Sequence, residues 1–235
     1  MGSIANIVKY GKKASHDFSL KKLNPKSWDW QKIIWPFRVL THPIQAFTEI
    51  KYEKRGSIAL SIVVLLLWFF SSIYKYLEQG FQFNTNRAED LNVTNLFMST
   101  AVVIILWSIS NWAICTLMDG EGWFKDIWIC NCYAVMPQVV TIIPLTIISK
   151  FVTIDEGAFI TMATTVAFAW MVLLMFLANS TVHQYSFGKS VFAMVLTFLG
   201  VLILLLLLIL VMSLFVEMWD FIKTIYQELV FRLMT

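Results

Sequence analysis

Residues 191–216 read VFAMVLTFLGVLILLLLLILVMSLFV, a run of twenty-six positions without a charged side chain. An α-helix rises 1.5 Å per residue, so about 20 apolar residues cross the roughly 30 Å hydrocarbon core of a bilayer. This run is therefore long enough to span a membrane as a tilted helix. It lacks the alternation of polar and apolar residues that marks an outer-membrane strand, so a helix is favoured.

Four further uncharged runs precede this one and predict four more spans. They are Ser57–Tyr74, Leu96–Met118, Ile127–Ser149 and Ala158–Leu177. The chain is 58% hydrophobic and 14% charged with a mean hydropathy of +0.70, whereas soluble domains are about 45–50% apolar and about 25% charged. We expect an all-α fold, a polytopic bundle of five transmembrane helices that forms one membrane domain over residues 57–216.

Lys and Arg are distributed unevenly around these spans. Eleven of the eighteen precede residue 57, and loops on the same side add Lys125 and Lys189. The positive-inside rule predicts a cytoplasmic N-terminus and an extracytoplasmic C-terminus. Because no short apolar stretch precedes the first span, we expect no cleaved signal peptide. The basic N-terminal segment is expected to contact anionic lipid headgroups, and a nucleic-acid partner is not expected.

Both flanks of the membrane domain are predicted to be helical. Residues 27–50 carry several aromatic residues and are interrupted by Pro36 and Pro43, which predicts two short helices at the membrane interface or packed under the bundle. Apolar residues recur at helical spacing in 217–235, which predicts an amphipathic extracytoplasmic helix along the outer leaflet or a docking helix for a partner. The predicted divisions are therefore 1–56, 57–216 and 217–235.

The densest polar chemistry lies in residues 118–137, MDGEGWFKDIWICNCYAVMP. Its three acids precede or begin the third span, where carboxylates stabilise the positive end of a helix. An EF-hand loop requires oxygen ligands at alternate positions, but Trp123 and Cys130 occupy ligand positions of such a loop. CDP-alcohol phosphotransferases follow their Asp-Gly with an Ala-Arg pair, which is absent here. Cys130 and Cys132 would point about 200° apart on a helix and would not converge on one metal.

The same stretch contains the expected turn and kink of the bundle. Gly120 and Gly122 permit a tight turn between two antiparallel helices, and Pro137 and Pro144 are expected to kink the third span. The partners expected for the freed backbone groups are Asn131, Gln138 and Thr141. The residues expected to form hydrogen bonds between helices are Asn111 in the second span and Thr161, Thr164 and Thr165 in the fourth.

No motif of a known catalytic class is present. The chain lacks G-x-S-x-G, H-E-x-x-H and a phosphate-binding loop, and its three histidines, His16, His42 and His183, are scattered and interpreted as solvated loop residues. No span carries a charged residue near its centre, which argues against an ion-coupled transporter. We therefore predict no enzyme activity, no cofactor and no metal.

Short motifs in a fixed order resemble the Yip1-domain family of five-span membrane proteins, and its bacterial branch in particular. Before the first span the sequence THPIQAFTEIKYEKRGS resembles the family's entry motif. An acid-Gly turn and a Tyr–Pro pair then mark the entry to the third span. The matching residues within 40–215 are His42, Pro43, Phe47, Ile50, Lys54, Arg55, Gly56, Asp119, Gly120, Gly122, Tyr133 and Pro137.

The resemblance implies a non-enzymatic membrane protein that acts through protein or lipid contacts. The DLYGP motif of eukaryotic members is missing, so their vesicle-trafficking role is not carried over. We expect a scaffold or adaptor in the bacterial cytoplasmic membrane, with an endomembrane as the alternative location. The second hypothesis is an accessory or channel-like subunit of a transport complex, such as an ABC-type sugar importer with its permease subunits. The third is an enzyme that uses three acids, Asp119, Glu121 and Asp126.

The residues expected to be structural or to contact a partner are His42, Pro43, Phe47, Asp119, Gly120, Glu121, Gly122, Tyr133 and Pro137.

Overall fold

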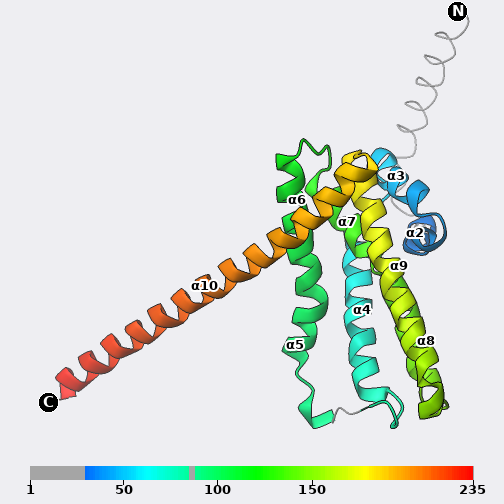
Figure 1. Cartoon of the computed structure of the whole chain (residues 1–235). Coiled ribbons are helices and arrows are strands. Elements are labelled where there is room, and N and C mark those ends of the chain that lie inside the picture. The colour runs from blue at the N-terminus through cyan, green and yellow to red at the C-terminus, as the bar shows by residue number, and fades with distance from the viewer. Residues whose placement is uncertain (1–29, 85–87, 235) are drawn as a thin grey trace, which may run out of the picture. The chain divides into compact units, whose positions relative to one another are not determined.

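The computed structural model describes residues 30–84 and 88–234 (Figure 1). The chain divides into two compact units, residues 1–34 and 35–235, and of the first only the beginning of one helix is described. Most of the basic N-terminal residues predicted to contact anionic lipid lie outside the described residues. Throughout the described part the regular structure is helical.

Two helices precede the first span, as the sequence predicts. α2 (Trp30–Thr41) continues through Pro36, and α3 (Pro43–Glu53) begins immediately after His42. The break therefore comes at the second proline, whose missing N–H is tolerated at the first position of a helix. α3 packs on α9 and α7 and buries apolar side chains there, so it is part of the bundle. An interfacial position of α2 stays a prediction.

Within residues 30–84 and 88–234, five helices are long and apolar enough to cross a membrane, in agreement with the five predicted spans. The first is α4 (Ile58–Glu78). The second joins α5 (Val93–Phe97), the π-helical turn η3 (Met98–Val102) and α6 (Val103–Leu117). The third joins α7 (Phe124–Ala134) and α8 (Met136–Ile148). The fourth is α9 (Gly157–His183), which follows η4 (Ile154–Glu156). The fifth lies within the long helix α10 (Phe187–Met234). Another short 3-10 helix, η2 (Ala88–Asp90), precedes α5.

The third span lies at the centre of the bundle. α7 contacts α4, α6 and α9, and α8 contacts α4 and α9 (Figure 1). In its most apolar stretch 56% of the residues are buried, whereas the figure for the fifth span is 6%. The other helices therefore pack around the third span. The helix breaks at Val135, two residues before Pro137, and the expected kink is confirmed at this position. α8 continues through Pro144.

α10 is a single helix of 48 residues, about 72 Å long at 1.5 Å per residue. It packs on α6 and α9, and Gly200 allows close approach, since an added Cβ would lie 2.3 Å from Ser110 Oγ. The segment 217–234 is helical as predicted, but it continues the fifth span without a break and does not form a separate helix. Its expected contact with the outer leaflet stays a prediction.

Asparagine side chains join the spans, as the sequence predicts for Asn111. Its Nδ2 donates to Asn179 Oδ1 at 3.0 Å and to Thr197 Oγ1 at 3.3 Å, which links α6 to α9 and α10. Asn131 Nδ2 donates to Ser108 Oγ at 3.1 Å and links α7 to α6. These groups are buried, and the hydrocarbon core offers no water to bond them. Each pair therefore satisfies polar groups that would otherwise lack a partner.

The threonines of α9 do not join helices, and this part of the prediction is wrong. Thr161 Oγ1 donates to the carbonyl of Gly157, and Thr164 and Thr165 donate to the carbonyl of Thr161. A threonine hydroxyl reaches a carbonyl one turn back on its own helix, and this local bond is available without a partner helix.

Candidate functional site

The turn between α6 and α7 closes with a left-handed residue that is not glycine. Asp119 has φ 56°, whereas none of the described glycines has a positive φ. The N–H of Gly120 donates to the carbonyl of Cys115 at 2.8 Å, the bond that closes a Schellman motif after the last turn of α6. Aspartate tolerates this conformation better than most side chains. The prediction that the glycines supply the backbone freedom is therefore wrong.

The two glycines are required instead by close packing against the end of α9. A Cβ added at Gly120 would lie 2.4 Å from His183 Nδ1 and 2.7 Å from Tyr185 Oη. A Cβ added at Gly122 would lie 2.7 Å from both His183 Cε1 and Val182 Cγ1. Any larger residue at either position must displace one of these buried side chains. We call this turn, residues 118–123, with the side chains that contact it, the α6–α7 corner.

His183 is buried in the α6–α7 corner, so its interpretation as a solvated loop residue is wrong. It is the last residue of α9, which extends six residues beyond the predicted end of the fourth span at 177, and it is 2% exposed. Its ring stacks on Tyr185 with centroids 5.3 Å apart. Among the described residues neither ring nitrogen of His183 has a hydrogen-bond partner.

Tyr185, in the segment that follows α9, is hydrogen-bonded to the end of α6. Its hydroxyl lies within donating distance of two carbonyls at the end of α6, that of Cys115 at 3.0 Å and that of Met118 at 3.3 Å. The Cys115 carbonyl also accepts from the N–H groups of Met118 and Gly120. The ammonium of Lys189 lies 4.4 Å from the centroid of the tyrosine ring. Burial raises the pKa of the Tyr185 phenol, which therefore remains a protonated donor at neutral pH.

Two ion pairs connect α3 and its C-terminal end to the α6–α7 corner. Lys51 Nζ lies 3.0 Å from Glu121 Oε2, and Lys54 Nζ lies 2.7 Å from Asp126 Oδ2. The Asp126 side chain is only 5% exposed, whereas that of Lys54 is 59% exposed, so the ammonium reaches inward from the surface to a buried carboxylate. Both acids thus hold elements together, and Asp126 lies in the first turn of α7 as predicted.

The α3–α4 connection lies directly on α7. A Cβ at Gly56 would be 2.8 Å from Ile129 Cγ2 and 3.0 Å from Ile50 Cγ2, so only glycine fits without displacement. Tyr133 is fully buried, and its hydroxyl is 3.4 Å from both the N–H and the carbonyl oxygen of Ser57. Residues 76 positions apart in the sequence therefore meet here.

The thiols of the third span do not form a centre of their own. Cys130 and Cys132 are free and almost fully buried. In residues 30–84 and 88–234 no group of three His, Cys, Asp or Glu side chains could hold a metal ion. Pro137 lies farther along, buried in the first turn of α8 and away from the α6–α7 corner.

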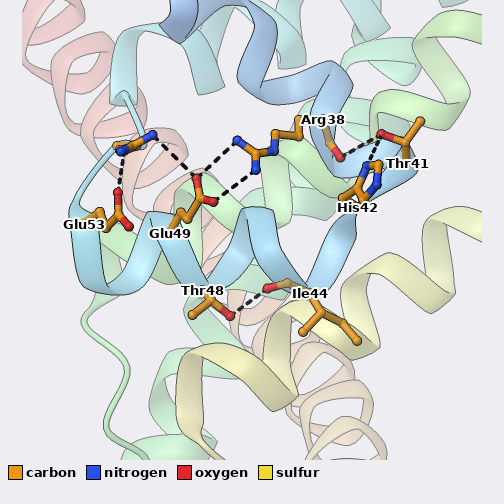
Figure 2. Close-up of polar contacts among 8 residues, drawn as sticks. Arg38, Thr41, His42, Ile44, Thr48, Glu49 and Glu53 are labelled. Carbon is orange, nitrogen blue, oxygen red and sulfur yellow. Dashed lines mark hydrogen bonds and ion pairs between the residues drawn. The ribbon is translucent and has the colours of Figure 1, made fainter.

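The family entry motif covers both ends of α3. At the beginning of α3, His42 is exposed with its Nδ1 3.0 Å from Thr41 Oγ1, and Pro43 opens the helix (Figure 2). Phe47 is fully buried in the main core. The structure therefore places Phe47 as a packing residue, whereas His42 is exposed, and its contact with a partner stays a prediction.

An ionic network fixes α2 against α3. Arg38 Nη2 lies 3.2 Å from Glu49 Oε1, and Arg55 lies 3.8 Å from Glu49 and 2.6 Å from Glu53 (Figure 2). Both guanidinium groups also lie over the Trp35 ring, at 4.8 and 5.4 Å from its centroid. Two cations and two anions balance, so this surface carries no net charge of its own.

A match to a family model identifies the family of this chain. The Yip1 domain family model matches residues 37–210, which include all five spans as far as the middle of α10. The chain belongs to the Yip1 domain family. It is a multi-pass membrane protein, and members of this family are generally non-enzymatic and implicated in membrane trafficking and protein interactions. No curated protein and no solved structure matches the chain.

In this Yip1 domain the sequence motifs and the spatial site overlap only in part. The α6–α7 corner gathers Gly120, Glu121 and Gly122 as a unit, whereas His42 and Pro137 lie elsewhere. Sequence reasoning missed the side chains that complete the corner; they are Lys51, His183 and Tyr185. Their signal was weak, since it consisted of polar residues close to the ends of predicted helices.

Proposed function

We propose that this Yip1 domain protein is a non-enzymatic membrane scaffold or adaptor that holds other membrane proteins through α10. We place it in the bacterial cytoplasmic membrane with its N-terminus in the cytoplasm and its C-terminus outside. The three acids of the third hypothesis support this function better than catalysis, because Glu121 and Asp126 are engaged in ion pairs and Asp119 forms the turn.

The observation that carries the proposal is the uncovered length of α10. From 205 to 229 every residue of this helix is exposed. The helix is about 72 Å long, whereas a bilayer with its headgroups is about 40–45 Å thick. A tilt within the usual range leaves the last turns beyond the hydrocarbon core. This region also lies beyond residue 210, where the family match ends, so it is suited to a partner specific to this protein.

One side of the last turns is apolar and the other is polar. Ile222 and Ile225 lie on the apolar stripe, and Asp220 and Thr224 lie about half a turn away. A stripe of this kind is buried when an amphipathic helix docks against a groove or another helix. An accessory subunit of a transport complex, for instance an ABC-type sugar importer, would use the same surface, and the identity of the partner distinguishes the two roles.

Site-specific photo-crosslinking in cells tests the proposal. A photoreactive residue at Ile222 or Ile225 should yield adducts with a defined membrane protein, identified by mass spectrometry, whereas the matched positions Asp220 and Thr224 should yield none. Permease subunits among the adducts would favour the transport role. Adducts with lipid alone, or equal yields at all four positions, would overturn the proposal.

The proposed orientation has a separate test. Phe151, in the α8–α9 connection, and Lys125, at the beginning of α7, are both exposed at opposite ends of the third span. The native cysteines are buried and should not react. A membrane-impermeant maleimide should label Phe151→Cys in intact cells and Lys125→Cys only after permeabilisation. The reversed pattern would invert the topology.

A further inference from the structure

A groove of about 550 Å³ runs along the seam between α8 and α9. We call it the α8–α9 groove. Its lining is mainly apolar and comes from α8, α9 and Leu40 of α2; the hydroxyl of Thr141 and the indole N–H of Trp170 are its polar groups. Pockets of this volume are typical of sites that hold small ligands. The break before α8 and the small residues of α9 together explain why it exists.

Side-chain size shapes the groove. On α9, the small residues Ala163 and Ala167 lie one turn apart, and both line the groove together with Pro137 of α8. Large residues recur along the adjacent stripe of α9, at 159, 162, 166 and 170, and stand as one exposed wall. Val140 of α8 is exposed on the other side. The groove therefore opens sideways onto the same surface of the spans that faces lipid.

The chemistry of the lining selects an apolar occupant. The hydroxyl of Thr141 donates to the carbonyl of Pro137 at 2.6 Å and is already satisfied. A polar ligand would lose its bonds to water here without replacement, which costs several kcal/mol per group in hydrocarbon. A hydrocarbon chain has no hydrogen bonds to lose, and it fills space that would otherwise lack van der Waals contacts.

The length of the groove matches one leaflet. The wall from Phe159 to Trp170 rises about 17 Å at 1.5 Å per residue, and half of the roughly 30 Å hydrocarbon core is about 15 Å. We propose that the α8–α9 groove binds one acyl chain of a bilayer phospholipid. The site belongs to the membrane domain itself and does not depend on the partner surface proposed for α10.

The acyl chain, and not the headgroup, is what this site recognises. Among the described residues, no charged side chain lines the groove. Binding in the groove should therefore be similar for zwitterionic and anionic phospholipids that carry the same acyl chains.

The test uses the full chain in vesicles of phosphatidylcholine that carries a diazirine on one acyl chain, with phosphatidylglycerol of the same chains as a second arm. After irradiation, peptide mass spectrometry maps the adducts. We expect adducts concentrated on groove residues such as Ala163 and Val166, in both lipids, above the level on the exposed positions of α4 and α10.

A blocked groove provides the decisive comparison. Ala163→Trp fills the groove, and Val172→Trp, on the exposed far side of the same helix, is the matched control. Ala163→Trp should lower groove adducts to the level of the other lipid-facing positions, whereas Val172→Trp should leave them unchanged. Val140→Trp blocks from the opposite wall and serves if the first variant does not fold. Equal adducts everywhere or a signal confined to phosphatidylglycerol would each overturn the proposal.

Discussion

Replacing Gly122 by alanine probes the packing of the α6–α7 corner. The new methyl group would lie 2.7 Å from His183 Cε1 and from Val182 Cγ1, well inside the 3.4–4 Å of ordinary contact. Because both neighbours are buried, they have little room to move. Overpacking of this kind costs about 1–3 kcal/mol, and for a chain of this size each kcal/mol corresponds to a fall of about 2–4 °C in the melting temperature.

The assay is thermal unfolding in mild detergent, followed by intrinsic fluorescence. Gly188→Ala is the matched control, because a Cβ there meets nothing within 4 Å and alanine favours the helix; its melting temperature should stay equal or rise. His183→Ala should reduce the cost of Gly122→Ala when the two are combined, since one of the two clashing side chains is removed. The reasoning is refuted if Gly122→Ala melts like the wild type or if the two substitutions are additive.

Three further outcomes follow from the same corner. His183→Leu should raise the melting temperature, because leucine is close to histidine in size and the change removes two buried nitrogens without partners in the described structure; a lower value would contradict this. Lys54→Met should lower the free energy of unfolding by about 1–3 kcal/mol, because it leaves the Asp126 carboxylate without its cation. The loss is smaller than for a fully buried pair, since Lys54 is largely exposed. Adding Asp126→Asn should restore part of this stability in the same melts. Above about pH 10 an unfolded tyrosine ionises while the phenol of Tyr185, whose pKa burial raises, stays neutral, so stability should fall with rising pH. Melts over this range should fall more steeply for the wild type than for Tyr185→Phe, and parallel curves would exclude this contribution.

The five spans could be read from the sequence because their signal is local. A run of some twenty apolar residues must satisfy its backbone within one helix once it enters hydrocarbon, whatever its neighbours. The break in the third span was expected for the same kind of reason, since Pro137 removes a donor wherever it stands. The break itself lies at Val135. Pro137 has no N–H to donate to the carbonyl four residues earlier, so the helix is weakened on the N-terminal side of the proline.

The corner shows where local signals end. Gly120 and Gly122 look like flexible turn residues, but their role is to let His183 and Tyr185 approach, and that role depends on residues more than sixty positions away. The histidine itself was misjudged because the end of α9 was placed at the last strongly apolar residue, and helix ends are the least certain feature of a hydropathy pattern.

The helical membrane fold, the number of spans and the short motifs of a Yip1 domain are visible in the sequence, because each depends on composition and on residues close together in the chain. The pairing of polar groups became known from the packed helices. This packing pairs Lys54 with Asp126, places Tyr133 on the α3–α4 connection and opens the α8–α9 groove. These features depend on how helices distant in sequence pack, and a periodic pattern carries no information on which face meets which.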